Sequence, residues 1–333
     1  MQAMLLERQA PIASAPLRAV ALPSPEPTAG EVRVRILACA ACRTDLHVIE
    51  GDLVPRRLPL VPGHQAVGIV DALGPGARRL RLGERVGIAW LRSACGHCRF
   101  CQSGRENLCE AGTYMGWTDD GAYAQHTTVP EDFAYRIPDG FDAAEAAPLL
   151  CAGIIGYRAL RRSQVPRGGR LALYGFGSSA HITLQVARHW GCRVYVATRN
   201  SGHRRLAAAL GAAWVGGADD ALPTPVDAAI VFAPAGALVP VALRSLDKGG
   251  TVALAGIHMS EVPAMAYEPH LFWEKTLQSV TASTREDGEA LLREAAAIPL
   301  RPRIRRSPLG ELNRVLQDLA ADRVEGTAVL IPE

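Results

Sequence analysis

The sequence predicts a two-domain α/β protein, in which a partly antiparallel β-barrel is joined to a doubly wound parallel sheet. Three observations lead to this fold class. The chain has 333 residues, which is long for a single hydrophobic core. Its first ~145 residues hold short alternating apolar runs broken by Gly and Pro. From about residue 150 onward, strand patterns alternate with helical patterns.

The barrel prediction rests on four runs that are typical of strands with one buried face. They are EVRVRILA at 31–38, VGIVDALG at 67–74, ERVGIAW at 84–90 and YAQHTTV at 123–129. Successive side chains of a strand point to opposite faces, so alternation of apolar and polar residues is the expected pattern.

The parallel sheet is predicted from an ordered series of strand and helix patterns. RLALYGFG is an apolar strand ending in glycines, and SSAHITLQVARHW after it has helical periodicity. The series continues with RVYVAT, HRRLAAALGA, VDAAIVFA and GTVALAG. Such alternation implies parallel strands joined by right-handed crossovers.

The last ~50 residues resemble neither series, and we expect them to rejoin the first domain. They contain a helical pattern, GELNRVLQDLAADR, and a strand pattern, GTAVLI. We therefore predict one domain of residues 1–149 and 284–333, and a second domain of residues 150–283.

Composition excludes some partners and favours a reducing compartment. The net charge of +3 gives little reason to expect a nucleic-acid partner. No apolar run reaches the ~18 residues that span a bilayer. Glu7 and Arg8 stand where a signal peptide would be apolar. We expect a cytoplasmic protein, whose thiols stay reduced and free to bind metal.

Four of the eight cysteines lie in one short segment, CGHCRFCQSGRENLC. The C-x2-C-x2-C-x7-C spacing of Cys95, Cys98, Cys101 and Cys109 allows the sulfurs to face one centre, whereas disulfides so close together would be strained. Four thiolates suit a closed structural zinc site. An iron–sulfur cluster uses the same ligands, but the last interval differs from both ferredoxin patterns. We expect zinc.

A glycine pattern predicts a dinucleotide site. Gly175, Gly177 and Ala180 fit G-x-G-x-x-G/A between a predicted strand and a predicted helix. Backbone amides at such a helix start can approach a pyrophosphate. A plain tight turn would give the same letters, so the strand–turn–helix context carries the interpretation.

Three further segments hold candidate metal ligands: CRTDLH at 42–47, PGHQAVG at 62–68 and LLCAG at 149–153. Singly, Cys42 and Cys151 could be buried small apolar residues and His64 a turn residue. Together with the four-cysteine segment and the glycine turn, they resemble the zinc-dependent alcohol dehydrogenases of the medium-chain dehydrogenase/reductase family. The resemblance follows the family's order over essentially the whole chain.

The resemblance implies a GroES-like catalytic barrel and a Rossmann domain. It also implies reversible oxidation of small alcohols, expected to be primary, to aldehydes by hydride transfer to a nicotinamide cofactor. Cys42, His64 and Cys151 would bind a catalytic zinc whose fourth position stays open. With the four-cysteine site, two zinc ions are expected per chain.

The same resemblance assigns roles to three neighbours of Cys42. Asp45 matches the acid that accepts the second ring N–H of the zinc-binding histidine. Thr44 and His47 match the path by which the alcohol proton leaves. An NADPH-dependent aldehyde reductase working in reverse would carry the same residues. A non-catalytic, zinc-stabilised cofactor-binding protein would not need Thr44 and His47.

Trp90 and Trp117 fall where the family lines its substrate pocket, although either could be a core residue. Two large rings would narrow the pocket toward small primary alcohols. Gln65 replaces a glutamate that is usual in the family and is a poorer metal ligand. Ile155 stands where many relatives have a threonine that touches the nicotinamide. Neither change removes a proposed zinc ligand, so we expect activity.

The residues after the second predicted strand of the parallel sheet favour NADP over NAD. NAD-binding proteins of this fold carry an acid there, whereas this chain has Thr198, and residues 146–218 contain no Asp or Glu. A guanidinium and polar groups could bind a 2′-phosphate, although the first arginine could instead stack on the adenine. The candidates are Arg199, Asn200, Ser201 and Arg204.

The family's fold also implies a homo-oligomer, a dimer or a tetramer. We expect contacts along the edge of the nucleotide-binding sheet. The apolar segment GTVALAGIHMSEVPAMAY at 250–267 is the candidate.

Overall fold

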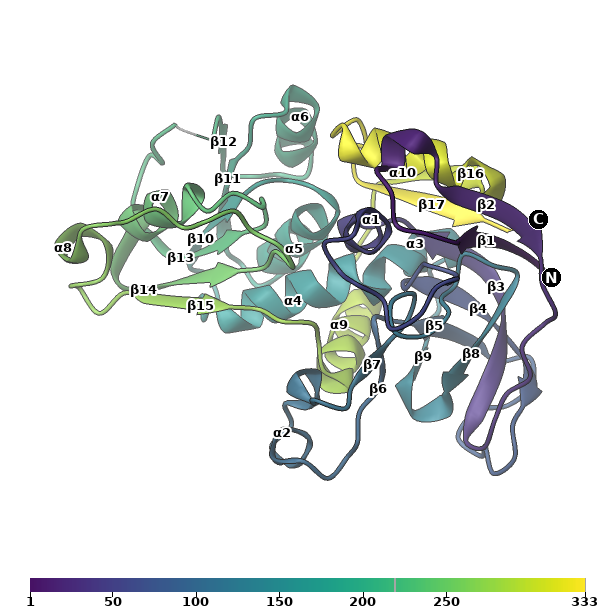
Figure 1. Ribbon diagram of the computed structural model, residues 1–333. Helices are drawn as coiled ribbons and strands as arrows, with labels where there is room; N and C mark the ends of the chain where they lie inside the picture. The colour runs from purple at the N-terminus through teal and green to yellow at the C-terminus, as the bar shows by residue number, and fades with distance from the viewer. Residues whose placement is uncertain (219, 333) are drawn as a thin grey trace. The chain divides into compact units, whose positions relative to one another are not determined.

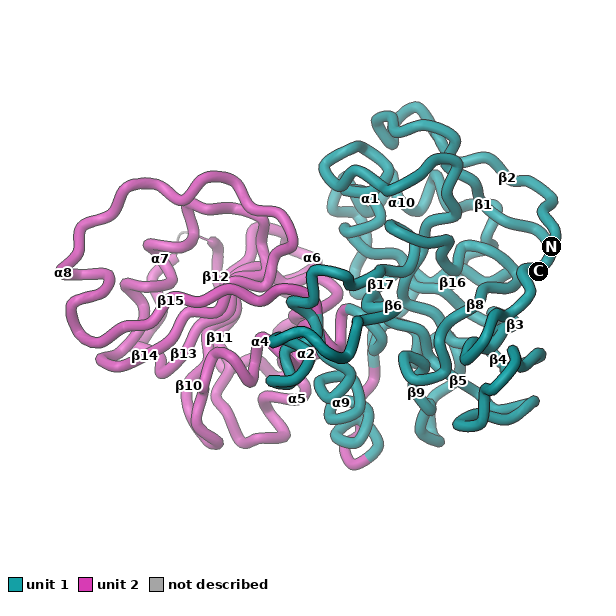
Figure 2. Tube along the Cα trace, turned by 60° about the horizontal axis from the view of Figure 1, so that its bottom comes forward, with its two compact units in different colours: residues 1–151, 283–296, 302–333 teal, residues 152–282, 297–301 magenta. Residues whose placement is uncertain are grey.

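The computed structural model of the protein describes residues 1–218 and 220–332. Its contacts divide the chain into two compact units (Figure 2). Unit 1 comprises residues 1–151, 283–296 and 302–333, and unit 2 comprises residues 152–282 and 297–301. This division lies within two residues of the boundaries expected from the sequence, apart from the short segment 297–301.

Unit 1 is built on a mainly antiparallel sheet that contains the four alternating runs predicted as strands. Within the described residues its order is β16–β17–β3–β4–β5–β9, with β8 also pairing β3. Only β16 and β17 pair in parallel within this sheet as described. The strands are β3 (Glu31–Ala40), β4 (Ala66–Leu73), β5 (Arg85–Ile88), β8 (His126–Pro130), β9 (Ala134–Arg136), β16 (Ile304–Pro308) and β17 (Thr327–Ile331).

The C-terminal segment completes this sheet, as expected. Val329 pairs with Ala40 and Leu330 with Cys39, which places β17 beside β3. The core lies against the apolar face of β3, where Val32, Val34 and Ile36 are buried. Two small ribbons add to the unit: β1 (Gln2–Leu6) with β2 (Leu17–Ala21), and β6 (Leu91–Ser93) with β7 (Thr113–Tyr114).

Most helices of unit 1 are short and lie in its connections, whereas α9 (Arg285–Ala297) has 13 residues (Figure 1). The others are η1 (Ile12–Ser14), α1 (Arg43–Glu50), α2 (Arg99–Gln102), η2 (Glu106–Leu108), η3 (Glu131–Phe133), α3 (Ala143–Ala146), η4 (Ala147–Leu150), η5 (Leu309–Glu311) and α10 (Leu312–Ala320).

Unit 2 is a six-stranded parallel sheet in the described part of the chain, in the order β12–β11–β10–β13–β14–β15. The strands are β10 (Arg170–Tyr174), β11 (Arg193–Ala197), β12 (Trp214–Gly216), β13 (Val226–Val231), β14 (Leu246–Leu254) and β15 (Thr276–Ser279). The helices are α4 (Ala152–Arg162), α5 (Ser178–His189), α6 (Ser201–Ala209), α7 (Leu238–Ser245) and α8 (Tyr267–His270).

The strand order of unit 2 reverses beside β10. The chain runs outward from β10 to β12, and then from β13 to β15 on the other side. Right-handed crossovers therefore put α5 and α6 on one face of the sheet and α7 on the other. The carboxyl end of β10 lies at this reversal, which is where doubly wound sheets bind their ligands. The predicted fold class is confirmed for both units.

No single helix among the described residues is both long and apolar enough to cross a membrane. One bent pair, Ala143–Leu150 with Ala152–Arg162, reaches the required length and composition together, and its apolar side chains are mostly buried.

Candidate metal and nucleotide sites

The sequence-predicted ligands of a catalytic metal come together in unit 1. Cys42 precedes α1, His64 follows a turn ahead of β4, and Cys151 follows η4. Their donor atoms all lie within 4.8 Å of one another, and His64 Nε2 is 3.2 Å from Cys151 Sγ. His64 is completely buried. One imidazole and two thiols converging on a point form a donor set that suits zinc.

The electrostatics of this cluster favour a cation at its centre. A hydrogen bond with the Cys151 thiol lowers the pKa of Cys42 well below its usual range, which favours a thiolate at this site. Burial lowers the pKa of His64, but the charge of Asp45 and its hydrogen bond outweigh burial and raise that pKa to about 10. The negative charges of Asp45 and Cys42 that raise this pKa also favour a cation such as zinc, which would replace the proton on Nε2.

Asp45 fixes the orientation of His64. Its Oδ1 accepts a hydrogen bond from His64 Nδ1 at 2.9 Å, which leaves Nε2 turned toward the two sulfurs. Asp45 Oδ2 caps α1 by accepting the backbone N–H of Cys42 at 2.9 Å. The same oxygen accepts the Tyr123 hydroxyl at 2.7 Å. No local sequence pattern predicts a role for Tyr123.

The two residues expected to carry the alcohol proton lie on α1 beside Cys42. Thr44 Oγ1 is 3.7 Å from Cys42 Sγ, and Thr44 is buried. His47 is near the end of the helix and forms a 2.7 Å contact from Nδ1 to Asp52 Oδ2. Asp52 was also missed, because a lone acid after a helix has no distinctive pattern. This bond favours the His47 tautomer with its proton on Nδ1.

Aromatic rings gather beside His64. The Trp90 ring meets the imidazole edge-on, with centroids 5.0 Å apart, and stacks on Trp117 at 5.7 Å. Tyr114 contacts both tryptophans at 5.3 Å and was not predicted. Trp117 is held by a hydrogen bond from Nε1 to the Val54 carbonyl at 2.9 Å. Gln65, directly after His64, is completely buried.

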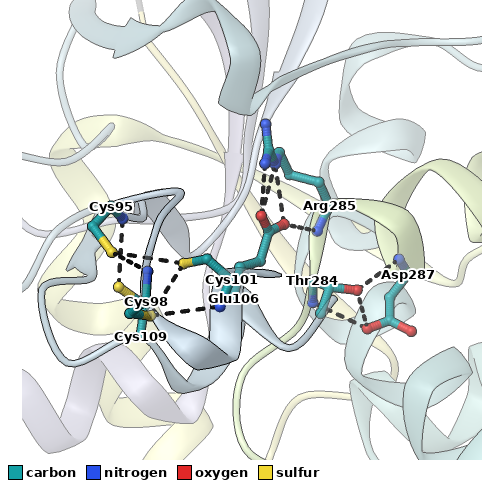
Figure 3. Close-up of polar contacts among 8 residues, drawn as sticks. All are labelled: Cys95, Cys98, Cys101, Glu106, Cys109, Thr284, Arg285 and Asp287. Carbon is teal, nitrogen blue, oxygen red and sulfur yellow. Dashed lines mark hydrogen bonds and ion pairs between the residues drawn. The ribbon is translucent and has the colours of Figure 1, made fainter. Parts of the chain in front are cut away.

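The four-cysteine segment forms a separate cluster in unit 1, with its thiols turned toward one another (Figure 3). Backbone N–H groups donate to the sulfurs: Cys98 to Cys95 at 3.4 Å, Cys101 to Cys98 at 3.5 Å, and Cys95 to Cys109 at 3.4 Å. The backbone around His97 and Cys98 lowers the pKa of Cys95 to about 6. Amides that stabilise thiolates around a closed four-sulfur centre fit a structural zinc.

An ion pair joins the four-cysteine segment, residues 95–109, to the start of α9 (Figure 3). We call this segment the cysteine lobe. Glu106, in η2 between the third and fourth cysteines, accepts from Arg285 Nε at 3.0 Å and from its Nη2 at 2.7 Å. The backbone N–H of Arg285 also donates to Glu106, at 2.8 Å. Thr284 and Asp287 cap α9 through bonds of 2.8 and 3.0 Å to Asp287 Oδ2. The lobe is therefore tied to a segment far away in the sequence.

The predicted nucleotide turn lies in unit 2 at the carboxyl end of β10. Gly175 has φ +88°, and a side chain there would meet the backbone N of Ala233 at 2.9 Å. Gly177 is the N-cap of α5, and a Cβ built on it meets no atom within 4 Å. Ala180 is completely buried, which allows α5 to pack closely. Gly177 thus leaves the start of α5 open to a pyrophosphate.

The residues expected to bind the 2′ position of the adenosine ribose follow β11. Thr198 is buried, and its backbone N–H pairs with Gly216 in the next strand. Arg199 and Ser201 are exposed. Asn200 caps α6, its Oδ1 accepting from the N–H groups of Gly202 at 2.8 Å and His203 at 3.2 Å. The guanidinium of Arg204 donates to the Thr198 carbonyl at 3.3 Å.

Comparison with known proteins identifies the family. The model of the alcohol dehydrogenase GroES-like domain matches residues 28–139, and that of the zinc-binding dehydrogenase matches residues 180–297. A probable alcohol dehydrogenase, AdhA, of Mycobacterium tuberculosis is 49% identical over 336 residues, covering 99% of this chain and 97% of its own. The chain is a zinc-dependent alcohol dehydrogenase of the medium-chain dehydrogenase/reductase family.

Other relatives and solved structures agree. An alcohol dehydrogenase of Geobacillus stearothermophilus is 36% identical, over 95% of this chain and 96% of its own. The cobalt- and zinc-bound thermostable alcohol dehydrogenase of Pyrobaculum aerophilum superposes with a TM-score of 0.90 at 25% identity, over 100% of this chain and 99% of that one. The alcohol dehydrogenase of Aeropyrum pernix gives a TM-score of 0.89 at 26% identity, with both chains covered completely. This dehydrogenase is thus a zinc enzyme that uses a nicotinamide cofactor and acts on small-molecule substrates of the alcohol or aldehyde class.

Proposed function

We propose that this dehydrogenase interconverts small primary alcohols and aldehydes, with two zinc ions per chain and NADP as its preferred cofactor. The observation that carries the proposal is the buried cluster of Cys42, His64 and Cys151. Asp45 accepts a hydrogen bond from His64 Nδ1, on the side of the ring away from the two sulfurs. The stacked rings of Trp90 and Trp117 lie beside His64.

Each residue around the cluster has a distinct role in the proposed reaction. When bound, zinc lowers the pKa of an alcohol hydroxyl and the nicotinamide accepts a hydride. The Thr44 hydroxyl accepts the substrate's proton by hydrogen bond while it gives up its own, and His47 takes up a proton on its partly exposed ring and releases it to solvent. Asp52 holds that ring. The rings of Trp90 and Trp117 limit the width of the substrate.

Zinc content tests the two-site assignment. The wild type is expected to hold two zinc ions per chain by elemental analysis. Cys98→Ser should keep the catalytic zinc and lose stability, whereas His64→Ala should keep the structural zinc and lose turnover. A His64→Ala protein with wild-type turnover would place the catalytic site elsewhere. Iron in either site would overturn its assignment.

A substrate series tests the pocket. Trp90 and Trp117 are expected to give higher kcat/KM for short primary alcohols than for branched or secondary ones. Trp117→Ala should widen the pocket and reduce this preference about tenfold or more. The control is Trp190→Ala in unit 2, whose ring packs on Tyr157. An unchanged preference in Trp117→Ala would remove this residue from the pocket.

The proposal of NADP is supported by the side chains that follow β11. Arg199 is exposed, and Thr198 replaces an acid that would repel a 2′-phosphate. A charged hydrogen bond is worth about 1.5–3 kcal/mol, which corresponds to roughly ten- to a hundredfold discrimination. Arg199→Ala should lower kcat/KM for NADP by that factor and leave the value for NAD nearly unchanged. Arg193→Ala, at the opposite end of the same strand, is the matched control. Equal values for both cofactors in wild type and Arg199→Ala would refute the assignment.

We also propose a homo-oligomer formed through the β15 edge of the unit 2 sheet. Exposed large apolar side chains concentrate in residues 257–273, next to this edge: Ile257, Val262, Tyr267, Phe272 and Trp273. Phe272 meets both Tyr267 and Trp273 edge-to-face. Part of this patch belongs to the segment 250–267 indicated by the sequence. Light scattering should give a mass above that of one chain, and Phe272→Glu should reduce it. A stable wild-type monomer would end this proposal.

A further inference from the structure

Asp45 accepts hydrogen bonds from three donors. They are the ring of His64, the backbone of Cys42 and the hydroxyl of Tyr123, and Tyr123 is the one that is not a proposed zinc ligand. His64 Nδ1 reaches Oδ1, while the Cys42 backbone N–H and the Tyr123 hydroxyl both reach Oδ2. The Tyr123 contact, at 2.7 Å, is the shortest of the three. Tyr123 is completely buried and Asp45 is 2% exposed. This carboxylate is therefore held by fixed protein donors on both oxygens.

The Tyr123 hydroxyl is positioned by the backbone that carries His64. Residues 121–123 run beside residues 61–63, with Tyr123 N donating to Pro62 O at 3.0 Å and Ala122 N to Gly63 O at 3.0 Å. The Tyr123 ring lies against Gly63, where an added Cβ would be 2.8 Å from its Cγ. The carbonyl of Tyr123 accepts from Met4 N at 2.8 Å. The ring consequently has little freedom to move away from Asp45.

A buried hydroxyl needs a partner, and two acceptors are within reach of Tyr123. The Ala40 carbonyl lies at 3.4 Å, at the limit of a hydrogen bond, whereas the Asp45 carboxylate lies at 2.7 Å. Charge-assisted bonds of this length are the stronger kind. The hydroxyl therefore interacts chiefly with the carboxylate that orients His64.

We propose that Tyr123 is a positioning residue that tunes the metal site through Asp45 and His64; this inference rests on the proposed catalytic zinc. Its hydrogen bond fixes the carboxylate and withdraws negative charge from it. Asp45 then pulls less strongly on the Nδ1 proton, and the imidazole donates less electron density through Nε2. A metal held by a weaker donor stays more electrophilic, which favours alcohol ionisation at lower pH.

Tyr123→Phe tests the inference, because it removes one oxygen atom and keeps the ring. Partners of metal-binding histidines affect metal affinity by about 10–100-fold. Tyr123→Phe leaves Asp45 with one fixed donor fewer, so His64 is oriented less firmly. We expect this loss of positioning to outweigh the stronger donation of the imidazole and to give roughly three- to tenfold faster zinc release from the catalytic site. We also expect the pH profile of kcat/KM for alcohol oxidation to move to higher pH by about half a unit. Zinc release is followed with a chromogenic chelator, and the cobalt-substituted protein reports the ligand field by its visible spectrum.

The matched control is Tyr195→Phe in unit 2. Tyr195 is 1% exposed, and its hydroxyl has no hydrogen-bond partner among the described residues, so its removal should change neither readout. A Tyr123→Phe protein with wild-type zinc release and pH profile would overturn the inference. A uniform fall in kcat with both readouts unshifted would equally overturn it, because it would indicate a packing defect alone.

Two further variants separate this inference from the proposed function. Asp45→Asn should speed zinc release about 10–100-fold, and His64→Ala should abolish catalytic zinc binding. If both keep their zinc, the catalytic zinc assignment itself is wrong. If both lose zinc while Tyr123→Phe behaves as wild type, only the role of Tyr123 is wrong.

Discussion

At the residue scale, the position of His64 depends on the preceding residue, Gly63, having no side chain. Gly63 has φ +98° and lies so close to Tyr123 that a Cβ would be 2.8 Å from both the ring Cγ and the backbone N. Neither contact can relax easily, because residues 121–123 are hydrogen-bonded to residues 61–63 on the same side. Glycine is required here by space as well as by conformation.

We expect Gly63→Ala to separate the two segments and displace His64. The variant should lose at least tenfold in kcat/KM and hold less than one catalytic zinc, as measured by kinetics and elemental analysis. Gly76→Ala is the control, since Gly76 has φ +78° but no atom within 4 Å of an added Cβ. That change should cost only about 1 kcal/mol of stability and leave zinc content unchanged. Equal effects of the two substitutions would attribute the Gly63 requirement to backbone conformation alone.

Replacing His47 tests the proton path. His47→Ala should slow turnover by up to about 10²–10⁴-fold, because only the proton exit is removed. The variant's rate should rise with the concentration of a bulky, non-coordinating buffer that can replace the imidazole. Zinc content and cofactor affinity should stay at wild-type values. A larger loss, or weaker cofactor binding, would assign His47 a different role.

Residue-level roles could be predicted from the sequence where local spacing carries them. The four cysteines lie within fifteen residues, so their spacing alone predicts a metal site. The roles of Cys42, Thr44, Asp45 and His47 follow instead from the resemblance of their short segment to the family. The Tyr123–Asp45 and Arg285–Glu106 bonds join residues 78 and 179 positions apart. No local pattern predicts such bonds, because the fold alone brings these residues together.

At the element scale, the start of α9 supports the cysteine lobe. Desolvation raises the pKa of Glu106, but hydrogen bonds and charge from Arg285 outweigh it and lower that pKa below its usual range. Glu106 is 8% exposed, so its charge depends on this partner. Arg285 also covers the face of Phe133, with Cζ 4.5 Å from the ring centroid. The lobe is therefore held by the protein as well as by metal.

We expect Arg285→Ala to destabilise unit 1 by about 2–3 kcal/mol, because it leaves a buried carboxylate without its cation. Thermal unfolding at pH 7 measures the change, with zinc content checked on the same sample. The double variant Glu106→Gln with Arg285→Ala should recover part of the loss. If the double variant is less stable than the single one by the full cost of Glu106→Gln, the two side chains are not coupled.

An ion pair between the starts of β10 and β13 in unit 2 predicts how the stability of the protein depends on pH. It joins Arg170 to Asp227, and neither residue belongs to a cysteine cluster. Hydrogen bonds from Arg170 hold the pKa of Asp227 below its usual range, with contacts of 2.6 Å from Nη2 and 2.7 Å from the backbone N. Because the folded-state pKa is lowered, the stabilisation is complete above the unfolded pKa of about 4 and is lost as pH falls through the lowered value. Asp227→Asn should cost about 1 kcal/mol at pH 7, and its difference from wild type should shrink below pH 4. Urea unfolding at a series of pH values checks this, and a difference that grows on acidification would contradict it.

At the scale of the whole molecule, periodicity predicted both sheets and the return of the chain to the first one. The series of strands and helices from residue 170 to 256 appears in unit 2 in the expected order. Periodicity did not predict that residues 297–301, at the end of α9, belong to unit 2. Gln185 bonds Arg301 in both directions, donating to its carbonyl at 3.2 Å and accepting its N–H at 3.0 Å. These bonds and the burial of Ile298 and Leu300 accompany a boundary that the hydrophobic pattern does not mark.

The return of the chain to its first sheet has a consequence for biosynthesis. Strand β17 lies between β16 and β3, and the Ala328 carbonyl accepts the N–H of Ala41, next to Cys42. A ribosome must therefore translate all of unit 2 before the segment that completes the sheet beside the metal cluster can emerge. Nascent chains arrested before residue 327 should leave Cys39 and Ala40 of β3 without their partners in β17, because β8 pairs only with residues 31–35 of that strand. Such an open stretch of edge invites pairing with other chains. The parallel sheet of unit 2, by contrast, has all its strands as soon as β15 is released, so the nucleotide-binding half can fold first.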